Sequence, residues 1–181
     1  MKNIWFLRMD KSLIEDFKFC EETPFIYSNH GICGDKALTL QYKNKLFPEL
    51  QLTKPELKTA ISDIKKVLVK DSRLNEKAFG KERCYIAILY WLSTMTVGDI
   101  VFVRTHLNEV FLCRVTDYIS ESFFDRYGRF QRPVQVLQKL SKTMISEGLW
   151  QRTAGRKTIE RNAKKAINEL VRKHLRKYNL E

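Results

Sequence analysis

The segment over residues 120–129 carries side chains suited to chemistry with a polyanion. Its sequence, SESFFDRYGR, interleaves aromatic rings with arginines. Aromatic faces stack on nucleobases and guanidinium groups pair with phosphate oxygens, so this composition favours contact with a nucleic acid. The alternative is a loop whose aromatic side chains fold back onto the core. The residues concerned are Phe123, Phe124 and Tyr127, with Arg126 and Arg129 beside them.

A second set of residues could hold a metal ion. Asp35, Glu56 and Lys58 are the residue types of the carboxylate–Glu-x-Lys site of metal-dependent nucleases. Thr53 stands three residues before Glu56, with Pro55 between them, and this spacing predicts a helix start with a capping box. The helix start explains Glu56 without catalysis, so a small metal-dependent nuclease is kept only as an alternative.

The chain carries a large excess of positive charge. Its 181 residues include 33 Lys and Arg against 21 Asp and Glu, a formal net charge of +12. Residues 151–181 alone contain ten Lys and Arg and three Glu, a net +7. A basic excess of this size favours a polyanionic partner, most often a nucleic acid. The alternative is a surface whose charges serve only solubility.

Several functional classes lack their signatures. The four cysteines and three histidines are scattered without a Cys-x-x-Cys pair, so we expect reduced thiols, no metal site and no cofactor. No apolar run reaches the roughly 18 residues of a membrane span and no signal peptide is evident, so we expect a cytoplasmic protein. No phosphate loop or nucleophile elbow occurs, and we assign no catalytic residue. These observations favour a binding module over an enzyme.

A hairpin organises the elements that must position these residues. Gly98 and Asp99 predict a turn, and residues 100–104 and 110–115 predict two strands joined by a short polar loop. Both strands are apolar at nearly every position. This predicts that both of their faces are covered, as in a small closed barrel.

Periodicity and capping signals predict the remaining elements. We expect strands over residues 3–9, 24–28 and 131–137, and helices over residues 12–19, 54–68, 82–94, 142–149 and 158–178. The last helix has an apolar stripe on one side and Lys and Arg on the other. We divide the chain into a domain over residues 1–155 and a basic amphipathic helix over residues 156–181. That helix packs on the domain or leads to an effector domain.

The order of these pieces resembles one family pattern. The matching pieces are Trp5 and Arg8, the loop 31–35, Gly98-Asp99-x-Val101-x-Val103, Val115-x-Asp117-Tyr118, Arg132-Pro133-Val134 and Arg152-Thr153. Over residues 3–160 the chain resembles the PUA-like superfamily, in particular the EVE and YTH-like domains at the N-termini of modification-dependent restriction proteins of the McrB type. It departs from the family at Ile32 and Val136, where members often have Trp, and at Cys113, where a glycine is common.

The resemblance implies an α+β fold, a small, strongly bent PUA-like β-barrel with surrounding helices and a basic C-terminal helix. It also implies that the domain binds DNA or RNA and flips one base, often a methylated one, into an aromatic pocket. Trp5, Tyr27 and Tyr118 would wall this pocket, and Asn29 and Asp35 would hydrogen-bond the base edge. The phosphate contacts would be Arg104, Arg126, Arg129, Arg152, Arg156 and Lys157.

We therefore expect DNA with a methylated base as the partner, within a modification-dependent restriction system. A fused or separate NTPase or nuclease effector would supply any catalytic activity. The alternatives are an RNA-binding PUA-like domain, the small nuclease, and an adaptor that binds another protein through the amphipathic C-terminal helix.

Overall fold

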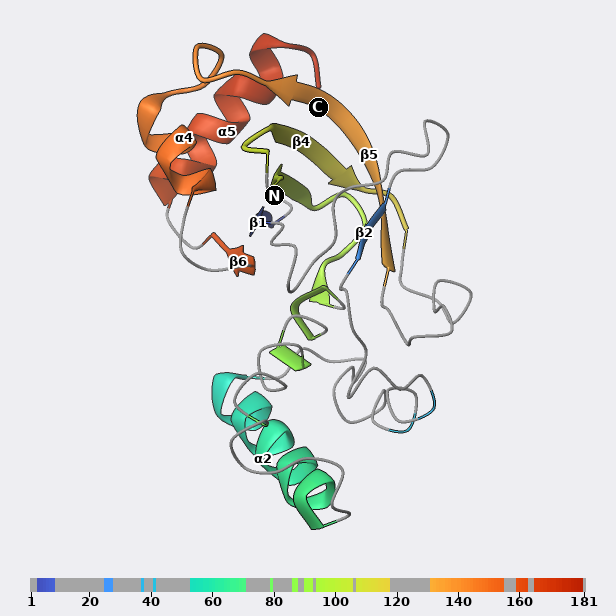
Figure 1. Cartoon of the computed structure of the whole chain (residues 1–181). Coiled ribbons are helices and arrows are strands. Elements are labelled where there is room, and N and C mark those ends of the chain that lie inside the picture. Colours follow the sequence, from blue (N-terminus) through green and yellow to red (C-terminus); the bar gives the residue numbers. More distant parts are fainter. Residues whose placement is uncertain are drawn as a thin grey trace. The chain divides into compact units, whose positions relative to one another are not determined.

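The chain forms two compact units that interrupt each other in sequence. The first contains Met1–Ile26, Met95–Tyr118 and Arg132–Glu181, and the second contains Tyr27–Thr94 and Ile119–Gln131. Figure 1 shows the computed structural model of the whole chain. The residues it describes are 3–8, 25–27, 37, 41, 53–70, 79, 86–87, 90–92, 94–105, 107–117, 131–154, 159–162 and 165–180.

The main sheet has six strands in the order β2-β5-β4-β3-β1-β6. The strands are β1 (Ile4–Arg8), β2 (Phe25–Tyr27), β3 (Ile100–Arg104), β4 (Val110–Val115), β5 (Gln131–Leu140) and β6 (Ile159–Arg161). β1 runs parallel to β3, whereas the β1–β6, β3–β4 and β4–β5 pairs are antiparallel. With the helices described below, the sheet confirms the predicted α+β class. Its order ends at β2 and β6, and closure into a barrel stays a prediction.

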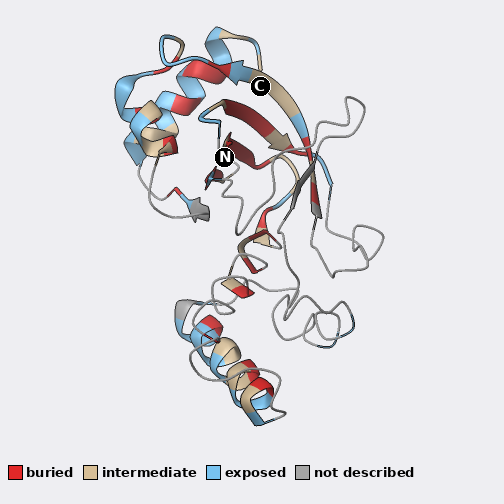
Figure 2. Ribbon diagram, in the orientation of Figure 1, coloured by how far each residue is buried: buried red, intermediate tan, exposed pale blue. Residues whose placement is uncertain are grey.

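The β3–β4 hairpin has the predicted bounds. Asn108 in its loop has φ 62, a left-handed conformation that asparagine adopts more readily than most residues. Both strands are buried along their length, and only Arg104 and Arg114 are half-buried (Figure 2). The prediction that both faces of this hairpin are covered is therefore confirmed.

The carboxylate of Asp99 joins the start of β1 to the start of β3. Asp99 is fully buried and follows Gly98, whose φ of 84 forms the turn before β3. The carboxylate accepts hydrogen bonds from Trp5 Nε1 at 2.8 Å and from the Asn3 backbone N–H at 2.9 Å. The backbone N–H and the hydroxyl of Thr96 each donate to it at 3.0 Å. These donors compensate a buried negative charge that would otherwise be costly.

One hydrophobic core lies between a face of the sheet and the helices α4 (Glu147–Thr153) and α5 (Lys165–Lys177). The rings of Phe6 on β1 and Phe102 on β3 stack with their centroids 5.3 Å apart. Leu149 of α4 and Val171 and Leu175 of α5 complete this cluster. The C-terminal helix therefore packs on this face of the sheet through Val171 and Leu175.

The C-terminal helix is shorter than predicted. We expected it over residues 158–178, but the chain first forms β6, and α5 begins at Lys165. β6 pairs with β1, and the Asn162 backbone N–H then donates to the Ile4 carbonyl at 2.7 Å. The open edge of β1 offers backbone partners, and this pairing overrides the helical periodicity of the sequence.

The helix predicted over residues 142–149 is displaced toward the C-terminus. Ser146 is its N-cap, because Ser146 Oγ accepts a hydrogen bond from the Leu149 N–H at 3.3 Å. α4 then ends at Thr153. At β5 the prediction was too short, since the strand runs to Leu140 instead of residue 137.

In the second unit the longest described element is α2 (Lys54–Lys70). The Glu56 carboxylate accepts from the Thr53 backbone N–H and hydroxyl, each at 2.7 Å, and these bonds lower the pKa of Glu56. The predicted capping box is therefore confirmed. Leu57, Ile64 and Leu68 are buried on the predicted apolar stripe (Figure 2).

The remaining predicted elements are described only in part. Residues 86–87, 90–92 and 94 are helical, within the helix predicted over residues 82–94. The helix predicted over residues 12–19 lies outside the described residues. Within the described part of the chain, no helix is long and apolar enough to cross a membrane.

We predict that Asp99→Asn lowers the free energy of unfolding by about 3 kcal/mol, because an amide NH2 would then face donors that now meet a carboxylate oxygen. Urea denaturation measures this loss. Asp63→Asn is the matched control, since Asp63 forms only an exposed ion pair with Lys66 at 3.2 Å and its loss costs less than about 1 kcal/mol. Equal losses in the two variants would contradict the anchoring role of Asp99.

Candidate functional site

The parallel pairing of β1 and β3 brings two arginines to the same end of the sheet. Arg8 and Arg104 are register partners at the last residue of their strands. Such partners lie about 5 Å apart and point to the same face of a sheet. Partial burial, and then the charge of Arg8, lower the pKa of the Arg104 guanidinium below its ordinary value. The fold thus holds two like charges close together.

No carboxylate among the described residues neutralises these two charges. Arg8 is exposed and Arg104 is half-buried, and neither forms a salt bridge with a described Asp or Glu. The acidic residue on the same hairpin, Glu109, pairs instead with Lys139. Neighbouring cations without a counter-ion create a positive potential that attracts an anion.

Contacts from the hairpin loop and from α4 fix the position of Arg104. Its Nη1 donates to the Thr153 hydroxyl at 3.0 Å, and its Nε donates to Asn108 Oδ1 at 3.4 Å. The guanidinium carbon lies 5.1 Å from the ring centroid of Trp150, which is cation–π geometry. Because Thr153 and Trp150 of α4 and Asn108 of the hairpin loop all contact the Arg104 side chain, the position of its guanidinium group is fixed.

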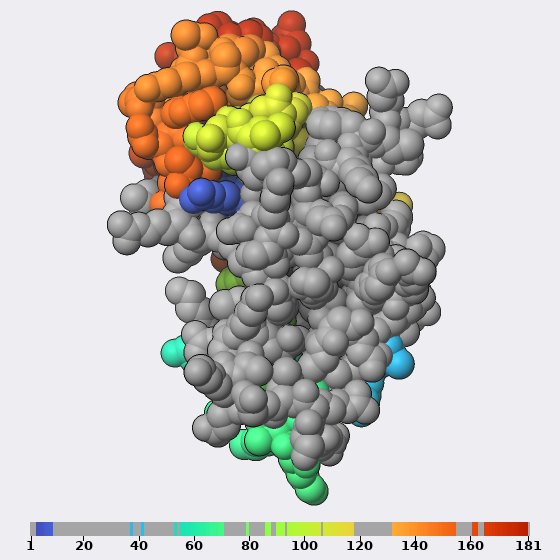
Figure 3. Space-filling model, viewed as in Figure 1, coloured from blue at the N-terminus to red at the C-terminus, as the bar shows by residue number. Residues whose placement is uncertain are grey.

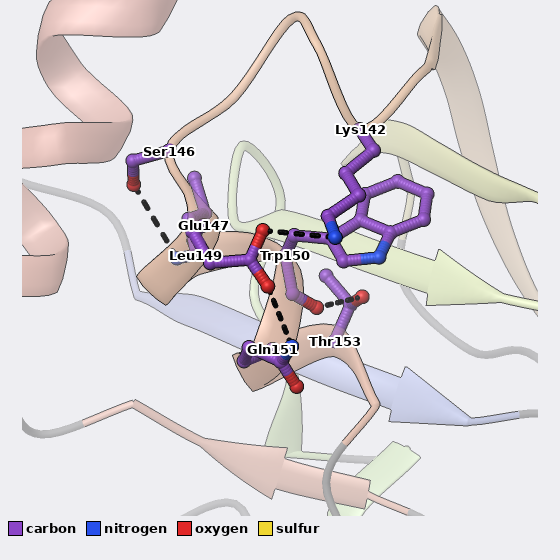
Figure 4. Close-up of polar contacts among 7 residues, drawn as sticks. All are labelled: Lys142, Ser146, Glu147, Leu149, Trp150, Gln151 and Thr153. Atoms are coloured by element: carbon purple, nitrogen blue, oxygen red, sulfur yellow. Dashed lines mark hydrogen bonds and ion pairs between the residues drawn. The ribbon is translucent and has the colours of Figure 1, made fainter.

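Polar contacts at both ends hold α4 (Figure 4). At its start, Glu147 accepts from Gln151 at 2.6 Å and pairs with Lys142 at 3.2 Å, and these bonds lower the pKa of Glu147. At its end, the Thr153 hydroxyl donates to the Trp150 carbonyl at 2.7 Å. The same hydroxyl oxygen can therefore accept the hydrogen bond from β3.

A third arginine comes from α4 itself. The guanidinium carbon of Arg152 lies 5.7 Å from the ring centroid of Phe6, which shares a face of β1 with Arg8. We call Arg8, Arg104 and Arg152 the arginine cluster. Arg104 and Arg152 are two of the predicted phosphate contacts, and the structure brings them to the same face of the sheet. Figure 3 shows the surface of β1 (blue) beside those of the β3–β4 hairpin and of residues 131–154.

The structure places Trp5 in the core. Its side chain has no exposed surface and its indole N–H is bound by Asp99. In this position it cannot stack on a base, so we leave it out of the proposed contact surface. Tyr27 ends β2, and the structure describes only its backbone. The other predicted site residues lie outside the described residues: Asn29, Asp35, Tyr118, Arg126, Arg129, Arg156 and Lys157.

Two members of this site were not predicted from the sequence. Arg8 could have been suspected, because it ends a strand on the same face as Ile4 and Phe6. Its neighbour on β3 lies 96 residues away, and no local pattern indicates a parallel pair of that kind. Thr153 is recognised only through its bond to Arg104.

The structure describes two of the three residues of the alternative metal site. Glu56 caps α2, Lys58 is exposed on the same helix, and Asp35 lies outside the described residues. Among the described His, Cys, Asp and Glu residues, no group of three could hold a metal ion. Cys113 is buried beside a register irregularity of β4, and burial raises the pKa of its thiol, as in a core cysteine.

Comparison of the sequence with protein-family models and with curated proteins, and of the structure with solved structures, finds no match.

We predict that replacing chloride by sulfate at constant ionic strength raises the Tm of the protein, because sulfate binds the arginine cluster of the folded state. At ten times its dissociation constant a ligand adds about 1.4 kcal/mol of stability. Arg8→Gln and Arg104→Gln should each reduce the sulfate-induced shift, measured by thermal melting. Lys165→Gln removes one exposed charge from α5 and should keep the full shift; similar shifts in all three variants would exclude anion binding by the cluster.

Proposed function

We propose that the protein is a nucleic-acid-binding module that contacts the phosphate backbone through the arginine cluster. The observation that carries the proposal is the pairing of Arg8 with Arg104, two adjacent cations with no carboxylate partner among the described residues. A phosphate diester supplies the missing negative charge. The planar guanidinium group matches two phosphate oxygens at once, and it does so better than a lysine ammonium.

The surroundings of the cluster support a polyanion over a single small anion. The exposed residues of α5 include Lys165, Arg172, Lys173, Arg176 and Lys177. This helix packs through Val171 and Leu175, so its cationic side faces away from the core. Cations on β1, β3, α4 and α5 of the same unit match the repeating charge of a nucleic-acid backbone. Such a match favours binding through the release of condensed counter-ions.

We extend the proposal, on the family resemblance, to a bent PUA-like barrel that reads a modified base in DNA. The long curve of β5 in Figure 1 is compatible with the wall of such a barrel. The remaining candidates for the pocket are Tyr27, Asn29, Asp35 and Tyr118. Binding energy from the arginine cluster would offset the few kcal/mol that extrusion of a base costs. A fused or separate NTPase or nuclease would complete a modification-dependent restriction system.

We predict that the protein binds a labelled 20-base-pair duplex in a fluorescence anisotropy assay and that the affinity falls steeply with salt. The double variant Arg8→Gln/Arg104→Gln should lower the slope of log K against log salt by about 2, because each lost phosphate contact removes about 0.9. Lys58→Gln/Lys66→Gln, which removes the same charge from the exposed side of α2, should keep the wild-type slope. Equal slopes for both double variants would refute the proposed interface.

The same assay separates the finer proposals. Tighter binding of a duplex with methylated cytosine or adenine supports base recognition, whereas equal affinity for every duplex removes that part alone. Preference for RNA of matched sequence would favour the RNA-binding alternative. Plasmid cleavage with Mg²⁺ or Mn²⁺ that is lost in Glu56→Ala would favour the nuclease, provided that the variant remains folded by circular dichroism.

A further inference from the structure

A pocket of about 220 Å³ lies between the start of α4 and the last turns of α5. Its walls are mostly aliphatic, and they include Ile145, Leu149 and Leu170. Ile145 and Leu149 are buried, whereas Leu170 is one of the large apolar side chains that remain exposed. An apolar hollow with an exposed leucine at its side is typical of a ligand site rather than of a core.

Cations face this apolar hollow without a described counter-ion. Lys173 and Lys177 line the pocket one helical turn apart on α5, and both are exposed. Neither forms a salt bridge with a described carboxylate. Of the acidic residues next to the pocket residues in the sequence, Glu147 of α4 is paired with Lys142. Glu169 of α5 is exposed and lies four residues before Lys173, but within the described part of the chain the two form no salt bridge. Among the described residues that line the pocket there are thus two lysines and no carboxylate, beside a largely apolar surface.

We propose that this pocket binds a small organic anion with an apolar body, such as a monocyclic aromatic or short aliphatic carboxylate. The apolar body would fill the aliphatic hollow, and the carboxylate would lie between Lys173 and Lys177. The size fits, because an apolar cavity of about 150 Å³ is enough for benzene. Pockets for larger, drug-sized ligands begin at about 300 Å³.

A nucleobase fits this pocket less well than a carboxylate does. The pocket is therefore distinct from the base pocket of the proposed function. A base edge presents both hydrogen-bond donors and acceptors, whereas the polar groups of the walls are mostly engaged. Ser146 Oγ accepts from the Leu149 N–H, and His174 Nε2 is 2.9 Å from Gln138 Oε1. A carboxylate needs only donors, and the two lysines provide them.

The pKa of His174 should respond to the charge of a ligand bound in the pocket. It lines the pocket and is itself buried. Burial, and then the charge of Lys177, lower the pKa of the imidazole, and a hydrogen bond with the Met144 backbone partly opposes them. The charged groups that line the pocket beside it are Lys173 and Lys177 of α5. The imidazole also contacts the neutral Gln138 of β5 and the ring of Tyr178, whose centroid is 4.7 Å from its own. A bound anion would stabilise the imidazolium and raise this pKa.

The test titrates the full-length protein with sodium benzoate and follows the imidazole resonances by NMR. The His174→Gln variant identifies the His174 signals among those of the three histidines. Benzoate should raise the pKa of His174 by about one pH unit. Benzyl alcohol and benzylammonium, which have the same ring without the negative charge, should bind more weakly and leave the pKa unchanged or lower.

Variants make the test specific to this pocket. Lys173→Met should weaken benzoate binding about fivefold, as expected for loss of one partly exposed ion pair. Leu170→Asp should abolish binding, because it places a competing carboxylate beside the hollow. Lys165→Met, on the same helix but outside the pocket, should bind like the wild type.

An unchanged His174 titration at saturating benzoate would overturn the inference, and so would equal affinity for benzoate and benzyl alcohol. Binding of an acidic, leucine-containing peptide in place of benzoate would also overturn it and would identify a protein-docking surface. Loss of duplex binding in the arginine-cluster variants leaves this result unaffected, so the two proposals fail separately.

Discussion

The buried carboxylate of Asp99 is the constraint on which the sheet depends. It receives donors from the start of β1 and from the turn before β3, and so it fixes how these two strands align. With that register set, Arg8 must lie beside Arg104 at the far end of the pair. A structural anchor at one end of the strands thus determines the electrostatics at the other end. The loss of Asp99 would affect both stability and the geometry of the arginine cluster.

Local signals in the sequence predicted much of the fold. The predicted hairpin strands and the predicted start of α2 are confirmed because their determinants lie within a few residues of each other. For the strands these are two continuous apolar runs joined by a short polar loop, and for α2 it is the Thr53–Glu56 capping box. β6 was predicted as helix because its partner, β1, is far away in the chain. The helical spacing of apolar residues shows only which side of a segment can be buried if it forms a helix. It does not show that a strand edge elsewhere in the fold, here that of β1, is available for pairing.

The candidate site was predictable only in its chemistry. Arg104 and Arg152 were predicted as phosphate contacts, which stays a prediction, and the structure brings both arginines to one face of the sheet. The sequence could not supply Arg8 as their neighbour, because that contact follows from a long-range parallel pair. The family resemblance suggested Trp5 as a wall of the base pocket, but in this structure its ring is buried and its indole N–H donates to the Asp99 carboxylate.

The position of β1 in the strand order has a consequence for how the protein is made. β1 leaves the ribosome before both of its neighbours in the sheet, which begin at Ile100 and at Ile159. Until both have been synthesised, a highly apolar strand has unpaired backbone edges that can recruit strands of other nascent chains. Pairing across such sequence separations is also slow. During biosynthesis of this sheet there is therefore an interval in which β1 is exposed to aggregation before its partner strands exist.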